Sequence, residues 1–194
     1  MVLHDCSTPE FPEQLKVIVA GGFGAGKTTF VGAVSEIEPL TTEERLTVAS
    51  VGTDDLAGVE TKQCTTVAMD FGRRTFAENT VLYLFGTPGQ SRFWFLWDEL
   101  CHGATGAVVL VDTRRLQDSF PVVEFFEKRR IPFVVAVNLF DGAYRYPASE
   151  VQRALGLGHE IPVVRCDARR GPDARDVLVA LIRHILHQLH PLSR

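Results

Sequence analysis

The sequence lacks the features that would assign it to several specialised classes of protein. Its 194 residues include only four cysteines, none in C-x-x-C spacing. A disulfide framework and a zinc site are therefore not expected. No apolar run approaches the roughly 20 residues that span a bilayer. The first residues show no leader pattern, and neither end carries a lipidation signal. We therefore expect a cytoplasmic protein without a membrane anchor.

An excess of positive charge is also absent. The formal net charge of −4 gives no basic footprint for nucleic acid, so no nucleic-acid partner is expected. The composition, 45 % hydrophobic and 23 % charged, is ordinary for a folded protein, and a chain of this length builds one core. We expect a single domain over residues 1–194, in which residues 1–13 form a short N-terminal extension.

Short apolar runs alternate with helical patterns, which is typical of a mostly parallel sheet covered by helices on both faces. The predicted fold class is α/β, a P-loop nucleotide-binding fold with a six-stranded sheet. The stretch from about 36 to 64 has no clear period, so a functional loop or an insertion is expected there. The six predicted strands are residues 15–20, 65–71, 81–85, 107–111, 132–137 and 161–164. The predicted helices are residues 27–34, 116–128 and 177–189.

A glycine-rich string, GGFGAGKT at residues 21–28, satisfies G-x-x-x-x-G-K-[ST] between a predicted strand and a predicted helix. Glycines let the backbone curl so that successive N–H groups, with those of the helix N-terminus, point at phosphate oxygens. Lys27 would reach the β- and γ-phosphates, and the Thr28 hydroxyl would bind Mg²⁺. The alternative, a chance glycine turn, predicts no nucleotide affinity. The predicted contacts are Gly21, Gly22, Phe23, Gly24, Ala25, Gly26, Lys27, Thr28 and Thr29.

A second pattern follows the predicted strand at 132–137. Residues 138–141 (NLFD) resemble the N-K-x-D element of GTPases, whose carboxylate accepts from N1–H and the N2 amino group of guanine. Adenine lacks these donors, and such a site can discriminate by roughly 10⁴. Asparagine and aspartate in a turn also occur for conformational reasons alone. Residues 166–169 (CDAR) resemble the S-A-K element, whose backbone reads guanine O6. The predicted base contacts are Asn138, Leu139, Asp141, Asp167, Ala168 and Arg169.

With these elements placed, the resemblance to small Ras-like GTPases covers nearly the whole chain. Residues 65–71 (TTVAMDF) resemble switch I, in which Thr66 would close over Mg²⁺ and the γ-phosphate. Residues 86–90 (GTPGQ) resemble D-x-x-G-Q of switch II, with Gly89 as a further nucleotide contact and Gln90 orienting the attacking water. The resemblance implies Lys27, Thr66 and Gln90 as catalytic residues, with Thr28 and Thr66 as metal ligands.

Three strings narrow this resemblance: TTVAMDFG, LFGTPGQSRFWF and VLVDTRR. They look most like the bacterial GTPases related to the gliding and polarity protein MglA, and are closest to those of actinomycete conservons. Resemblance to that group implies a GTP/GDP switch that uses Mg²⁺. It also implies a roadblock/LC7-type regulatory partner and a sensor-kinase-like protein.

Three positions depart from the family's pattern. Gly86 stands where most small GTPases carry an aspartate that holds Mg²⁺ through water, so weaker metal affinity is expected. Leu139 replaces the lysine of N-K-x-D, so we expect weaker nucleotide affinity. Phe23 replaces a glycine close to the γ-phosphate and would obstruct an arginine supplied in trans. The arginines nearest the switch segments in sequence, none of them assignable as a finger, are Arg45, Arg73 and Arg74.

Residues 93–97 (FWFLW) are five large apolar residues in a row, which cannot all face inward on one helix. They either dock a partner in the GTP state or fill a core beneath switch II. Both interpretations stay open from the sequence.

The predicted function is a GTP-binding molecular switch with slow intrinsic hydrolysis that acts on a partner through both switch segments. One alternative is a nucleotide-binding adaptor without turnover, favoured by Gly86 and the missing arginine finger. Another is a P-loop ATPase that uses Asp112, which follows the apolar run at 107–111.

Overall fold

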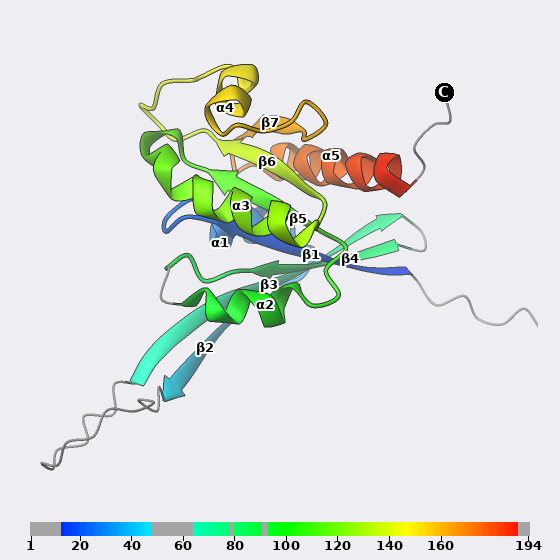
Figure 1. Ribbon diagram of the computed structural model, residues 1–194. Helices are drawn as coiled ribbons and strands as arrows, with labels where there is room; N and C mark the ends of the chain where they lie inside the picture. Colours follow the sequence, from blue (N-terminus) through cyan, green and yellow to red (C-terminus); the bar gives the residue numbers. More distant parts are fainter. Residues whose placement is uncertain (1–12, 48–63, 78–79, 91–92, 190–194) are drawn as a thin grey trace, which may run out of the picture.

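A seven-stranded sheet runs through the centre of the molecule, in the order β2-β3-β4-β1-β5-β6-β7 (Figure 1). The structure is a computed structural model that describes residues 13–47, 64–77, 80–90 and 93–189, with the backbone alone for residues 41–47, 64–68 and 77. Strand β3 is antiparallel to both of its neighbours, and every other adjacent pair is parallel. The strands are β1 (Glu13–Gly21), β2 (Leu40–Thr47), β3 (Cys64–Ala77), β4 (Thr80–Gly86), β5 (Gly106–Val111), β6 (Phe133–Asn138) and β7 (Val163–Cys166).

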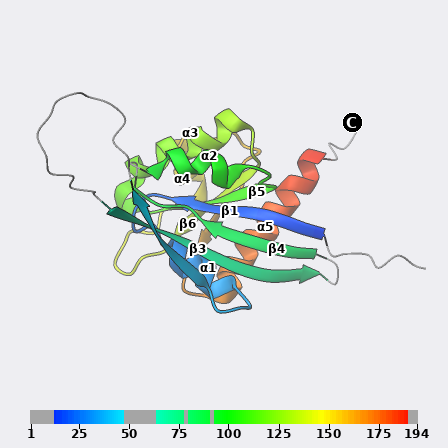
Figure 2. The ribbon, with the colours of Figure 1, turned by 90° about the horizontal axis from the view of Figure 1, so that it is seen from below.

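The central strands are buried on both faces, which explains their continuous apolar sequences. Strands β5 and β6 are buried along their whole length, and so is the second half of β1. Figure 2 shows β3, β4 and β1 side by side across the sheet. Because β1 lies between β4 and β5, the segment that follows β1 starts in the middle of the sheet edge.

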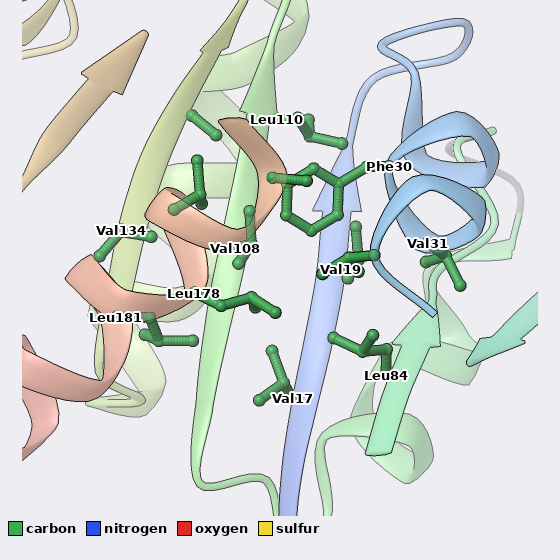
Figure 3. Packing of buried hydrophobic residues seen from close by; sticks show 14 of the residues in the cluster. Val17, Val19, Phe30, Val31, Leu84, Val108, Leu110, Val134, Leu178 and Leu181 are labelled. Carbon is green, nitrogen blue, oxygen red and sulfur yellow. The ribbon is translucent and has the colours of Figure 1, made fainter. Parts of the chain in front are cut away.

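Helices cover both faces of this sheet. Helices α1 (Lys27–Val34) and α5 (Gly171–Leu189) pack on one face; α2 (Phe95–Cys101), α3 (Phe120–Arg129) and α4 (Ala148–Ala154) pack on the other. Figure 3 shows the first layer, where side chains of α1 and α5 meet those of the strands. Each large apolar side chain buried there contributes about 1.5–3 kcal/mol. The fully buried members include Val17, Val19, Phe30, Leu84, Val108, Leu110 and Leu181.

All six predicted strands are present, which confirms the predicted α/β fold with its mostly parallel sheet. The seventh, β2, lies in the stretch of residues 36–64 that was expected to be a loop or an insertion, and that expectation is wrong for residues 40–47. Its sequence LTTEERLT is mostly polar, as is common for a strand at a sheet edge; among the described strands β2 pairs with β3 alone.

The predicted helix at 116–128 is two elements, the 3-10 helix η2 (Thr113–Ser119) and α3, which meet near Pro121. The short helices α2 and α4 were not predicted, because about two turns carry too little periodic signal. None of the helices in the described ranges is long and apolar enough to cross a membrane.

Candidate functional site

The loops that carry the sequence motifs meet at one edge of the sheet. Five parallel strands end there, at Gly21, Gly86, Val111, Asn138 and Cys166. In an open α/β sheet this edge is where ligands bind.

The P-loop lies between β1 and α1, and its glycines are required by its backbone geometry. Gly24 and Gly26 have φ angles of 74° and 102°, in the left-handed region that glycine tolerates without strain. A Cβ atom on Gly26 would lie 2.5 Å from Nδ2 of Asn138, so a side chain does not fit there. The carbonyl of Gly26 accepts from the N–H of Phe30 at 2.8 Å, which starts α1 directly after the loop.

A cavity of about 360 Å³ opens above the P-loop and the start of α1. Gly21 and Gly22 lie instead beside an adjoining cavity, and Ala25 is buried. The loop therefore lies between two cavities, and Phe23 lines both of them. The lining residues of the first, here called the phosphate cavity, are Phe23, Gly24, Gly26, Lys27, Thr28, Thr29, Asp70, Thr87, Pro88 and Gly89.

Lys27 is buried at the floor of the phosphate cavity. Its Nζ donates to the carbonyls of Gly21, at 3.0 Å, and Gly22, at 2.8 Å. Burial lowers the pKa of Lys27 to about 8, and the negative charge of Asp70 partly opposes this shift. Phosphate oxygens would supply the negative charge that a desolvated ammonium needs, as expected for the lysine of a P-loop.

Asp70 of β3 is a site residue that the sequence analysis did not identify. Its Oδ2 accepts from the Thr28 hydroxyl at 2.7 Å, and the residue is only 8 % exposed. A Cβ atom on Gly86 would lie 3.0 Å from Cβ of Asp70 and 3.1 Å from its Oδ2. The Asp70 side chain thus occupies the space above Gly86, the position where most small GTPases carry the metal-binding aspartate. Phe71 of β3 is paired with Phe85 of β4, and this antiparallel register brings Asp70 opposite Gly86.

Thr66, the predicted switch I ligand, does not lie beside Thr28 in this structure. It belongs to β3, where its Cα is paired with that of Arg45 in β2. Asp70 lies four positions further along the strand than Thr66, which is about 13 Å. The roles of Thr66 as metal ligand and catalytic residue stay predictions; in this structure β3 extends through the segment that was expected to close over the nucleotide.

The oxygen donors in the phosphate cavity fit Mg²⁺. Thr28, Asp70 and Thr87 offer two hydroxyls and a carboxylate, the hard ligands that this ion takes together with water and phosphate. The Oγ1 atom of Thr87 is buried without a hydrogen-bond partner in the structure, and Thr87 lines the phosphate cavity, where a ligand could supply that partner. Among the described residues, no group of three or more His, Cys, Asp and Glu side chains could hold a metal ion.

Gln90 lines the adjoining cavity of about 430 Å³, together with Phe23, Gly89 and Trp94, and does not line the phosphate cavity. Gly89 touches both, since a Cβ atom there would lie 2.6 Å from Nζ of Lys27. Gly89 therefore lies against the P-loop, whereas Gln90 lines the adjoining cavity; the nucleotide contact of Gly89 and the catalytic role of Gln90 stay predictions.

The aromatic run that follows Gln90 divides between core and surface. Phe93 and Trp97 are buried, and the Trp97 indole donates to the carbonyl of Pro88 at 3.2 Å. Phe95 is 61 % exposed. The expectation that the five apolar residues cannot all face inward is confirmed.

Asn138 ties the loops of the site together. Its Nδ2 donates to the carbonyl of Ala25 at 2.9 Å, and its Oδ1 accepts from the N–H of Ala168 at 3.0 Å. Leu139 donates its N–H to the carbonyl of Cys166 at 2.8 Å. The NLFD segment, the P-loop and the CDAR segment are thus connected by hydrogen bonds, which the sequence analysis did not predict.

Asp141, the predicted base reader, is in an ion pair. Nη1 and Nη2 of Arg169 donate to its two oxygens at 2.6 and 3.0 Å. Arg169 also donates through Nε and Nη2 to Asp167, at 2.8 and 2.7 Å. Hydrogen bonds from this guanidinium lower the pKa of Asp167 to about 2 and also lower the pKa of Asp141. The sequence placed all three residues at the site but did not predict their pairing.

Two arginines of η2, the element that follows β5, contact residues of the site. Arg114 donates three hydrogen bonds to Asp112, and its guanidinium carbon lies 3.8 Å from the ring centre of Phe140. Arg115 reaches the P-loop and donates to the carbonyl of Phe23. Asp112 is thus engaged by Arg114 and lies outside the phosphate cavity. Arg73 pairs with Glu36. Arg115, which reaches the P-loop, is not among the three arginines considered from the sequence.

This fold and site define a P-loop protein with a GTPase-like fold. The chain belongs to a family described as conserved hypothetical ATP binding proteins, whose profile matches residues 19–188. A relative in Methanocaldococcus jannaschii, the uncharacterized protein MJ1339, is 29 % identical over 131 residues, which is 66 % of this chain and 72 % of the relative.

Solved structures of G domains share the fold. The G domain of the FeoB iron transporter of T. maritima has a TM-score of 0.59 at 21 % identity, over 91 % of this chain and 99 % of that one. The FeoB G domain of Methanococcus jannaschii has a TM-score of 0.61 at 13 % identity, over 90 % and 99 %. At these identities the likeness concerns the fold alone.

Proposed function

We propose that the chain is a GTP/GDP-binding molecular switch that requires Mg²⁺ and hydrolyses GTP slowly. The observation that carries the proposal is the bridge made by Asn138 from Ala25 of the P-loop to Ala168. This bridge connects the P-loop to the end of β6, and Asp141 lies three residues beyond Asn138 in sequence. A nucleotide with its phosphates on the P-loop would therefore present its base to Asp141.

The phosphate half of the site would work through groups that are already oriented. Backbone N–H groups of the P-loop and the helix start would bind phosphate oxygens, and Lys27 would move from the Gly21 and Gly22 carbonyls to the β- and γ-phosphates. Thr28 and Asp70 would hold Mg²⁺, directly or through water, with Thr87 beside them. The ion would neutralise charge on the phosphate oxygens.

Slow hydrolysis follows from the position of Gln90. This side chain lines the neighbouring cavity, so it has to swing past Gly89 before it can orient a water at the γ-phosphate. Without help the rate should be on the order of 10⁻⁴ to 10⁻³ per second, as for unassisted GTPases. The resemblance to MglA-related conservon GTPases supports a roadblock/LC7-type protein, and a sensor-kinase-like protein, as partners of the switch.

ATP is the second candidate nucleotide, because the family is described as ATP-binding. The P-loop, Lys27, Thr28 and Asp70 would serve ATP and GTP alike. The two candidates differ only at the base, where Asp141 favours guanine. An adaptor without turnover is the remaining alternative. A single-turnover assay that released no phosphate over a day would favour it.

A competition titration tests the proposal. Labelled GDP bound to the purified protein with Mg²⁺ is challenged with excess GDP, GTP, ADP or ATP. Displacement by guanine nucleotides alone, with the preference reduced in Asp141→Asn, is the expected result. Stronger displacement by ATP would assign the protein to adenine nucleotides, and absence of binding to any label would reject a nucleotide site.

A further inference from the structure

Both carboxylate oxygens of Asp141 already accept hydrogen bonds from a neighbouring side chain, Arg169. Guanine recognition needs both carboxylate oxygens, one for N1–H and one for the N2 amino group. Arg169 takes both, with Nη1 on Oδ2 and Nη2 on Oδ1. Asp141 is otherwise open to solvent, with 83 % of its side chain exposed. The ion pair is therefore the main obstacle between this carboxylate and a base.

Arg169 is held in this position from its other side. The half-buried Asp167 side chain accepts from Nε and Nη2 of Arg169, and also from the backbone N–H of Arg169 at 3.0 Å. The backbone N–H of Asp167 in turn donates to Asp173 in the first turn of α5 at 3.0 Å. The guanidinium is thus anchored to the start of α5 and presents its remaining donors to Asp141.

This arrangement affects the two purines differently. Guanine would compete with Arg169 for the two Asp141 oxygens, whereas adenine makes no use of the carboxylate and leaves the pair intact. We propose that Arg169 is a specificity-determining residue that weakens guanine binding in competition with Asp141 and so narrows the preference for GTP over ATP. This inference rests on the proposed function, because it requires nucleotide binding at this site.

The test compares Arg169→Met with a matched control, Arg170→Met. Methionine keeps much of the stem and removes the charge, and Arg170 is the neighbouring arginine, 3.7 Å from the Asp173 carboxylate rather than on Asp141. Dissociation constants for GDP and ADP are measured with Mg²⁺ for both variants and the wild type. The removal of one positive charge changes the affinity for GDP and for ADP by the same factor, because both carry the same phosphates. This factor cancels in the ratio of the two dissociation constants.

The expected result is that Arg169→Met binds GDP about two- to fivefold more tightly relative to ADP, the range for an exposed ion pair, and that Arg170→Met keeps the wild-type ratio. The wild-type ratio should also shift toward GDP as salt rises, since screening weakens the Arg169–Asp141 pair, and this shift should vanish in Arg169→Met.

Three results would overturn the inference. An unchanged ratio would show that the pair does not compete, and an equal loss of both nucleotides would show that Arg169 supports either base. A selective loss of GDP would show that Arg169 assists guanine. The wild type alone tests the proposed function: if it binds neither nucleotide, both proposals fail, whereas normal wild-type binding with an unchanged variant ratio removes only the role of Arg169.

Discussion

Replacing Asp70 by asparagine separates the charge of this side chain from its size. The Thr28 hydroxyl can donate to an amide oxygen as it does to Oδ2, so the packing above Gly86 should persist. The negative charge, however, is lost from the only carboxylate that lines the phosphate cavity among the described residues. If Asp70 holds Mg²⁺ in place of the residue missing at Gly86, Mg²⁺ affinity should fall by about 10- to 100-fold.

The assay is the dissociation constant of the nucleotide, measured in excess Mg²⁺ and again in chelator. The wild type should bind more tightly with the ion, and Asp70→Asn should lose most of that gain while its affinity in chelator stays close to the wild-type value. Urea unfolding of both proteins controls for damage to the fold. An undiminished Mg²⁺ dependence in a folded Asp70→Asn protein would refute the reasoning.

A second pair of variants tests the same geometry through its close contact. Gly86→Asp alone places a Cβ atom 3.0 Å from Cβ of Asp70 and sets two carboxylates together, so it should destabilise the fold by about 1–3 kcal/mol from overpacking alone. Adding Asp70→Gly removes the conflict and should recover both stability and Mg²⁺ dependence. Additive effects of the two substitutions would contradict the idea that they share one space.

Three further predictions concern the rest of the site. Burial lowers the pKa of Lys27 to about 8, and bound phosphate would raise it, so nucleotide binding takes up a proton above pH 8. Nucleotide affinity measured by calorimetry should therefore fall about tenfold from pH 7 to pH 9. An affinity that does not change with pH would contradict this. Asn138→Ala leaves the Ala25 carbonyl and the Ala168 N–H unpaired at a buried position. The free energy of unfolding, measured in urea, should fall by about 1–3 kcal/mol for each unpaired group. A total fall below about 1 kcal/mol would count against the bridge. Arg115→Ala should weaken GDP and ADP alike by about fivefold, because the residue steadies the P-loop and not the base, and a selective effect would be the contrary result.

The sequence predicted the parts of the site that depend on backbone conformation. The P-loop is recognisable because glycine at positions such as 24 and 26 follows from local φ angles, and its place between β1 and α1 follows from periodicity. Asn138 was found for a related reason, since it ends a buried strand whose neighbours are fixed by the parallel order of the sheet.

The parts that escaped prediction depend on contacts between side chains of different elements. Asp70 stands in the quoted string TTVAMDFG, yet its role follows only from the antiparallel register that sets β3 against β4. The predicted strands, 65–71 and 81–85, did not set this register, because they left a connection of nine residues, whereas β3 extends to Ala77 and pairs there with Thr80. The contact of Arg115 with the P-loop and the pairing of Arg169 with Asp141 were not predicted, because the reach of a long side chain is not a property of its position in sequence.

The ATP-binding description of the family and the GTPase-like fold need not conflict in physical terms. The phosphate cavity is built from backbone groups, Lys27, Thr28 and Asp70, none of which senses the base, so either triphosphate would be bound there with similar strength. Under the proposed function, base choice would then rest on Asp141, one exposed carboxylate already in contact with Arg169. In such a site the preference for guanine over adenine depends on one side chain and is opposed by its neighbour. A single substitution can therefore change the preferred base, while the fold and the phosphate contacts stay the same.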